Sequence, residues 1–186
     1  MPKLTKNMLL YHGSFCEVTV PDLSKCAKYK DFGQGFYLTS SEEQARSFAK
    51  ISVRKAVDTG LIHPQEYGII STFRCIDPSG LNVCDYPKAD AEWLHCVVGH
   101  RRSNAFPDLV SKLMPYDVIS GKIANDNTNI TITAYMQGVF GDIGTDAADR
   151  ICIGLLLPER LQDQFCFRSK KSLNTLHFEW SDKVWL

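Results

Sequence analysis

The chain has 186 residues, of which 44% are hydrophobic, and this suits one globular domain with a substantial core. Its 21 basic residues balance 21 acidic ones, so the formal net charge is zero. Non-specific binding to nucleic acid or to anionic membranes needs a basic excess, and the balance argues against both classes of partner. We therefore expect a single domain over residues 1–186.

The cysteines and the N-terminus bear on metals and location. The 7 cysteines are an odd number with no CxxC spacing, which supports neither a disulfide framework nor a zinc ribbon. No two histidines stand at metal-ligand spacing with a third ligand, so we expect no metal. Near the N-terminus only Met8–Leu10 is an unbroken aliphatic stretch, too short for a signal-peptide core. No segment approaches the ~20 apolar residues of a membrane span, so we expect a soluble, cytoplasmic protein.

The first third of the chain predicts a strand, a loop and a strand–helix pair. The strand spans Asn7–His12, and a long polar loop with a short helical turn follows. In Asp31–Thr39, glycines precede an aromatic, β-prone stretch typical of a strand. Ser40 and Glu43 have capping-box spacing, apolar residues at helical spacing come next, and Gly60 is expected to stop that helix.

The rest of the chain alternates strands and helices. The expected elements are strands over Tyr67–Ile76, Leu81–Cys84 and Tyr116–Ala124, helices over Ala89–His100 and Asp146–Leu156, and final strands over Gln164–Arg168 and Leu176–Trp180. Pro158 is expected to stop the second helix, and a lysine-bearing turn is expected between the two final strands. Asn125–Asn127 predicts a polar turn, and Ile130–Phe140 is compatible with either strand or helix. Because no regular βαβ order appears, the predicted class is α+β with a mixed or antiparallel sheet.

Three short segments could carry chemistry, and the first ends the first strand. There His12 is followed at once by Gly13 and Ser14. A glycine lets a ligand approach the backbone, so that its N–H and C=O can bind a planar amide. A histidine at a strand end is more often structural, and the motif alone is weak.

The second and third segments are also short. Gly33–Tyr37 places two glycines ahead of a Phe-Tyr pair, which suits stacking on a heterocycle or, equally, a turn with core aromatics. Near the C-terminus, strand alternation puts Gln164 and Cys166 on one face, and Phe165 and Phe167 on the other.

Taken together, the three segments resemble the diphtheria-toxin-type ADP-ribosyltransferases, which include the poly(ADP-ribose) polymerases. There the first strand carries His-Gly, the second reads like G-K-G-I-Y-F, and the third supplies a glutamate followed by alternating apolar residues. The chain is also similar to a small bacterial branch with an E-W-L helix and a D-V-I-x-G-x-I-A-N-D-N segment, matched here by Glu92–Leu94 and Asp117–Asn127. The resemblance covers most of the chain and implies a split mixed or antiparallel sheet with flanking helices.

The resemblance implies that NAD is the substrate and that one ADP-ribose is transferred to a protein. His12 would hydrogen-bond the adenine-side ribose, the Gly13 backbone would hold the nicotinamide amide, and Tyr37 would stack on the nicotinamide ring. The expected NAD-binding residues are His12, Gly13, Ser14, Gly35, Phe36 and Tyr37. Small bacterial transferases of this kind often have a neutralising partner protein, which is a further candidate partner, whereas nucleic acid is a less favoured acceptor.

The chain departs from the family at the third motif, where Gln164 replaces the glutamate. A neutral amide can accept a ribose hydroxyl but can neither stabilise a cation by charge nor take a proton. Three interpretations remain: the acceptor needs no base, another acid substitutes, or the protein binds NAD without turnover. Asp126 is the first candidate acid, ahead of Asp163, so the expected catalytic residues are His12, Tyr37, Gln164 and Asp126. An NAD glycohydrolase is the alternative enzyme.

Overall fold

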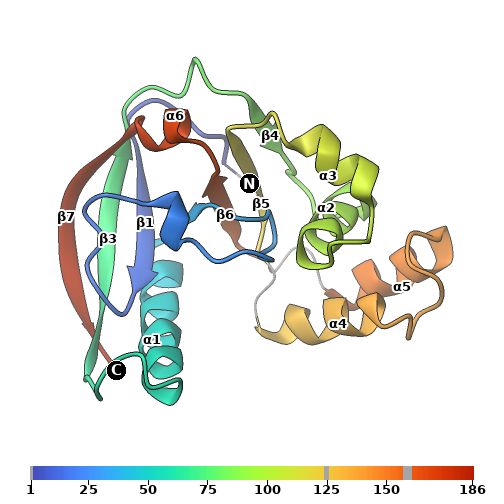
Figure 1. Cartoon of the computed structure of the whole chain (residues 1–186), viewed down its shortest axis with the longest axis horizontal. Coiled ribbons are helices and arrows are strands. Elements are labelled where there is room, and N and C mark those ends of the chain that lie inside the picture. Colours follow the sequence, from blue (N-terminus) through green and yellow to red (C-terminus); the bar gives the residue numbers. More distant parts are fainter. Residues whose placement is uncertain (1, 124–125, 157–160) are drawn as a thin grey trace.

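The computed structural model describes residues 2–123, 126–156 and 161–186, and over them the chain has the predicted α+β class. The strands form two sheets with helices around them (Figure 1). One sheet has the order β1 (Met8–Ser14), β3 (Tyr67–Cys75), β7 (Leu176–Trp185). The other has the order β2 (Phe36–Leu38), β6 (Asp163–Phe167), β5 (Val118–Lys122), β4 (Val83–Asp85). The first sheet is antiparallel, and the second is mixed because β4 and β5 run parallel.

Helix α1 (Glu42–Asp58) packs on the first sheet, beside β1 in Figure 1. Its N-cap is Ser41, whose side chain accepts a hydrogen bond from the Gln44 backbone N–H. The prediction of Ser40 as the cap was therefore wrong by one residue, because the Ser40 hydroxyl binds Asp163 instead. Gly60 ends the helix as predicted, with a φ of 69° that favours glycine.

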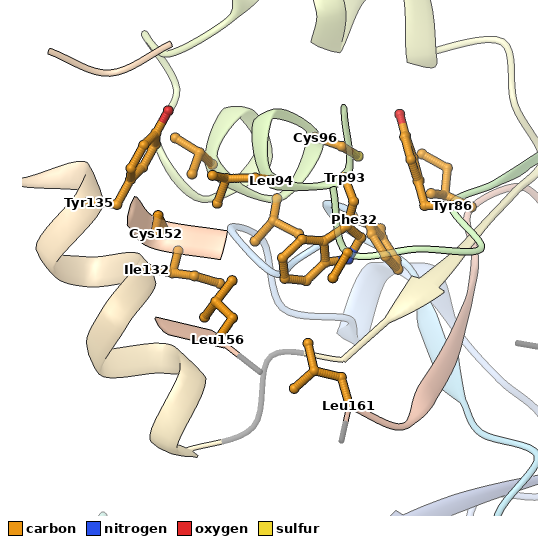
Figure 2. Packing of buried hydrophobic residues seen from close by; sticks show 14 of the residues in the cluster. Phe32, Tyr86, Trp93, Leu94, Cys96, Ile132, Tyr135, Cys152, Leu156 and Leu161 are labelled. Carbon is orange, nitrogen blue, oxygen red and sulfur yellow. The ribbon is translucent and has the colours of Figure 1, made fainter. Parts of the chain in front are cut away.

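Four further helices lie on the side of the second sheet away from β1 (Figure 1). They are α2 (Ala91–Arg101), α3 (Pro107–Leu113), α4 (Asp126–Met136) and α5 (Asp146–Leu156). Figure 2 shows side chains from three of them converging around Trp93, which is fully buried. The Trp93 indole N–H donates to the carbonyl of Lys122 at 2.9 Å, and this bond ties α2 to the end of β5.

In the middle of the chain, the structure corrects one local prediction, decides one open alternative and adds one helix. The expected polar turn at Asn125–Asn127 was wrong at Asp126, where α4 begins, and Asn125 lies outside the described residues. The ambiguous segment is helical as far as Met136 and ends in turns over residues 137–140. Within the helix, Ile132 and Tyr135 lie three residues apart and are both fully buried on one face. Helix α3 was not predicted.

The C-terminal part has more regular secondary structure than predicted. The expected lysine-bearing turn contains a short helix, α6 (Lys170–Leu173), and the last strand continues to Trp185 rather than ending at Trp180. The predicted stop of α5 at Pro158 lies outside the described residues. A single-turn 3-10 helix, η1 (Leu23–Lys25), supplies the short helical turn predicted for the long loop. Among the described residues, no helix combines the length and apolar character that a membrane crossing requires.

Candidate functional site

The two sheets meet where β1 passes β2, and the strands then separate. Tyr11 and Thr39 exchange two backbone hydrogen bonds, of 2.9 and 3.0 Å, and form an isolated antiparallel bridge. Continuing that register would place Gly13 opposite Tyr37, but no backbone hydrogen bond joins these two among the described residues. Alternate residues of a strand direct their backbone groups to the same side. The N–H and C=O of Gly13 therefore face the N–H and C=O of Tyr37 across this opening, which we call the β1–β2 split.

His12 borders the split. Its Nδ1 lies 2.8 Å from the Tyr37 carbonyl oxygen, and because a carbonyl only accepts, Nδ1 carries the proton and donates. The ring also packs on Phe36, with centroids 4.5 Å apart. Burial lowers the pKa of His12, although its bond to the Tyr37 carbonyl acts in the opposite direction. His12 is therefore a neutral imidazole near pH 7, and Nε2 is its hydrogen-bond acceptor.

Packing against α1 requires a glycine at position 13. A Cβ at this position would lie 1.9 Å from the carbonyl oxygen of Ala45 in α1, so only glycine allows the helix to approach β1 so closely. Ser14, the neighbouring predicted site residue, is 8% exposed, and its hydroxyl lies 4.0 Å from the Cys16 thiol. The packing against α1 explains why residue 13 is a glycine. It does not use the Gly13 N–H and C=O, which face the split.

Tyr37 anchors the loop that precedes it. Its hydroxyl donates to the Gly33 carbonyl at 2.8 Å and accepts from the Phe32 N–H at 2.9 Å. Burial raises the pKa of Tyr37 well above its usual value, so the phenol stays neutral. Since Tyr37 pairs with Cys166 of β6, both side chains lie on the same face of the second sheet.

Gly35 and Phe36, also predicted at the site, are packed into the protein. A Cβ on Gly35 would lie 2.4 Å from the Cys166 sulfur. Phe36 is 5% exposed and belongs to the core cluster that contains Phe165 and Phe167. Both residues directly precede Tyr37, and their packing fixes the path of the chain that leads to it.

Gln164 lies on the Cys166 side of β6, as predicted, and is held by a carboxylate. Its Nε2 donates to Asp31 Oδ2 at 2.9 Å and is 3.4 Å from the Lys122 carbonyl oxygen. Asp31 in turn accepts from Arg101 through Nε at 2.9 Å and Nη2 at 2.5 Å, both to Oδ1. Sequence reasoning missed Asp31 because only the tertiary fold brings it beside a residue 133 positions away.

The two other carboxylates considered for catalysis differ in what the structure shows. Asp126 begins α4, but its side chain lies outside the described part of the molecule. Asp163 accepts from Thr39 at 3.0 Å and from the Ser40 hydroxyl at 2.6 Å, while Gln164 binds Asp31. Asp163 therefore secures the start of α1 and points away from Gln164, as strand alternation predicts.

A cavity of about 420 Å³ adjoins the loop that precedes Tyr37. Its lining includes Gly33, Gln34, His100 and Arg168, but not His12, Tyr37 or Gln164. It is thus separate from the split. Over the described residues, no group of three or more His, Cys, Asp or Glu side chains is arranged to hold a metal ion.

Comparisons with known proteins place the chain in a family without assigning it a function. A search of curated proteins finds no match. A family model described as "Protein of unknown function (DUF3990)" matches residues 8–178, which include β1, the split, Gln164 and most of the remaining fold. On that match, the chain belongs to the DUF3990 family of proteins of unknown function.

Proposed function

We propose that this protein is an NAD-dependent mono-ADP-ribosyltransferase that modifies a protein. The observation that carries the proposal is the β1–β2 split, in which the Gly13 backbone faces Tyr37. A carboxamide such as that of nicotinamide offers N–H donors and one carbonyl acceptor, which the C=O and N–H of one strand residue complement. The Tyr37 ring lies beside this position and is suited to stack on a flat heterocycle.

His12 and Gln164 suit the two riboses of NAD. The neutral His12 has an acceptor, Nε2, for a ribose hydroxyl. Gln164 lies on the same face as the Tyr37–Cys166 pair and, from strand geometry, about 7 Å along β6 from Cys166. This spacing is compatible with a nicotinamide beside Tyr37 and its attached ribose beside Gln164.

In the proposed reaction, the bond between nicotinamide and the ribose C1′ breaks, and nicotinamide leaves with the bonding electrons. A nucleophile of the acceptor protein bonds to C1′, and any proton it carries is lost to solvent. The oxocarbenium-like cation that develops is of the kind met in glycoside hydrolysis. Gln164 cannot remove a proton, so we propose an acceptor that is already nucleophilic, such as a carboxylate or thiolate. Catalysis then depends on holding the amide and both riboses in place.

The bulk properties of the chain agree with a protein acceptor in the cytoplasm. Zero net charge offers no electrostatic attraction to nucleic acid. All seven cysteines are free thiols, which suits a reducing compartment. A neutralising partner protein is part of the proposal only through the resemblance, and co-purification would test it.

Incubation with NAD labelled in its adenylate moiety tests the function. We expect label to become attached to an acceptor protein and nicotinamide to be released. Free ADP-ribose with no labelled protein would instead identify an NAD glycohydrolase, and binding without nicotinamide release would identify a binding module. Absence of NAD binding by calorimetry would overturn the proposal. Tyr37→Ala should weaken any signal at limiting NAD by about tenfold or more. Gly80→Ala, at an exposed glycine with no atom within 4 Å of the added Cβ, should not.

A further inference from the structure

Asp31 determines which way the Gln164 amide points. The amide has two N–H donors on Nε2 and one acceptor, Oε1. Its nearest polar partners, the Asp31 carboxylate at 2.9 Å and the Lys122 carbonyl at 3.4 Å, can only accept. Nε2 must therefore face them, and Oε1 must face the opposite way. This orientation follows from the chemistry of the partners, since nitrogen and oxygen of an amide are otherwise hard to tell apart.

The Oε1 atom of Gln164 remains available. No hydrogen bond joins it to any described residue, and among those residues His100 Nε2 is the only fully buried side-chain N or O atom without a partner. Oε1 therefore keeps contact with solvent although Gln164 as a whole is only 5% exposed. Gln164 presents a single acceptor on the face that it shares with Cys166 and Tyr37.

We propose that Asp31 is a positioning residue, which fixes the Gln164 amide so that Oε1 accepts a hydroxyl of the reacting ribose. This inference rests on the proposed function. The reversed amide would present N–H groups to the ribose hydroxyls, and the positive end of its dipole would face the developing cation. The orientation seen here presents the negative end instead, which is favourable where cationic charge develops.

A comparison of variants at Asp31 and Arg101 separates the orientation of the Gln164 amide from the stability of the fold. Both hydrogen bonds of Arg101 to Asp31 go to Oδ1, whereas Gln164 binds Oδ2. In Asp31→Asn, the donor-only Arg101 keeps the single remaining oxygen, so the introduced NH₂ group faces Gln164 and forces its amide to reverse. In Arg101→Gln, the Asp31 carboxylate stays and the Gln164 amide keeps its orientation, although an ion pair is lost.

Nicotinamide release should be measured at pH 8 for both variants, together with their Tm. For Asp31→Asn we expect kcat to fall about tenfold, the effect of one lost or reversed hydrogen bond at the reacting centre, with KM within about twofold of the parent. For Arg101→Gln we expect a lower Tm but a kcat within about twofold of the parent. The double variant Asp31→Asn/Gln164→Glu exchanges donor and acceptor and restores the bond, so kcat should recover.

The measurements distinguish a positioning role of Asp31 from a purely structural one. If Asp31→Asn keeps the parental kcat, or if both single variants lose kcat in proportion to their Tm, Asp31 is only structural. If the unmodified protein neither binds nor cleaves NAD, the proposed function falls and this inference with it. Should Asp31→Asn fail to fold, ¹⁵N NMR of the unmodified protein at pH 8 replaces it. Slowly exchanging, downfield-shifted Gln164 side-chain N–H signals are expected, and signals like those of a free glutamine would overturn the proposal.

Discussion

The imidazole of His12 hydrogen-bonds the main-chain carbonyl of Tyr37 at the place where β1 and β2 part. A second backbone bridge would normally follow the one between Tyr11 and Thr39, but the histidine side chain takes this carbonyl instead. The interaction links the two strands through a side chain and also fixes the imidazole tautomer, with the proton on Nδ1. A histidine at a strand end thus has a structural role that leaves Nε2 as an acceptor.

Tyr37→Ala should weaken NAD binding more than Tyr37→Phe. A base–aromatic stack contributes about 1–3 kcal/mol in single-strand nucleic-acid recognition, a scale that we apply to nicotinamide, so the alanine variant should bind about tenfold weaker or worse. The phenylalanine variant keeps the ring but leaves the Phe32 N–H without its partner, which should cost about 1–3 kcal/mol of stability. Calorimetry and thermal unfolding measure the two effects separately. Parental NAD affinity in both variants would show that Tyr37 is a core residue only.

NAD affinity should fall as the pH drops through the folded-state pKa of His12, which burial lowers below the ordinary histidine value of 6.5. The folded-state pKa of His12 is lowered, so its contribution to stability is present above 6.5 and is lost as the pH falls through the folded-state value. Protonation of Nε2 also removes the acceptor proposed for a ribose hydroxyl. His12→Asn, which keeps a donor near the Nδ1 position, should bind NAD more weakly but without this pH dependence.

His100 provides the necessary control for that experiment. Its pKa is also lowered by burial, so it adds to the loss of stability at low pH. His100 is outside the split, and a His100→Asn variant should keep the pH dependence of NAD affinity. Calorimetric titrations over the range in which histidines usually titrate, roughly pH 5 to 8, distinguish the two residues. An unchanged profile in His12→Asn would remove His12 from the site.

Gly13→Ala should destabilise the fold strongly, because the added Cβ would lie 1.9 Å from a backbone oxygen of α1. Overpacking of this kind costs about 1–3 kcal/mol, and here the obstacle is backbone rather than a flexible side chain. Gly154→Ala is a matched control, since nothing lies within 4 Å of its added Cβ. That change within α5 should stabilise the protein by about 0.5–1 kcal/mol. Chemical denaturation of both variants tests the comparison, and equal stability would mean that α1 does not pack as closely as described.

Substitutions at Gln164 should separate a neutral acceptor from a charged one. Gln164→Ala removes one neutral hydrogen bond and should lower NAD turnover about three- to tenfold. Gln164→Glu places a second carboxylate beside Asp31, and because two adjacent carboxylates resist ionising together, one proton should be retained to a higher pH. Its NAD hydrolysis should therefore exceed that of the parent at high pH and fall steeply as the pH decreases. Parental activity in both variants would show that the third-motif match is accidental.

Much of the fold was predictable because its elements have strong local signals. The alternation along Gln164–Phe167 and the end of the helix at Gly60 both depend only on residues close in sequence. The structure confirms both predictions. Helix α4 was ambiguous because its threonines and isoleucines favour strand locally. Burial of Ile132 and Tyr135 against α2 and α5 decided for helix, and no local pattern carries that information.

Some features of the candidate site were likewise predictable from local sequence, and others were not. The sequence by itself determined that His12, Gly13, Tyr37 and Gln164 lie at or near strand positions, since glycine, aromatic and alternation patterns are local. Only the tertiary structure decided that Asp31 meets Gln164 and that Arg101 binds the other oxygen of the Asp31 carboxylate. Hydrogen bonds across 70 and 133 positions depend on how two sheets and a helix pack, and this packing is a property of the whole chain.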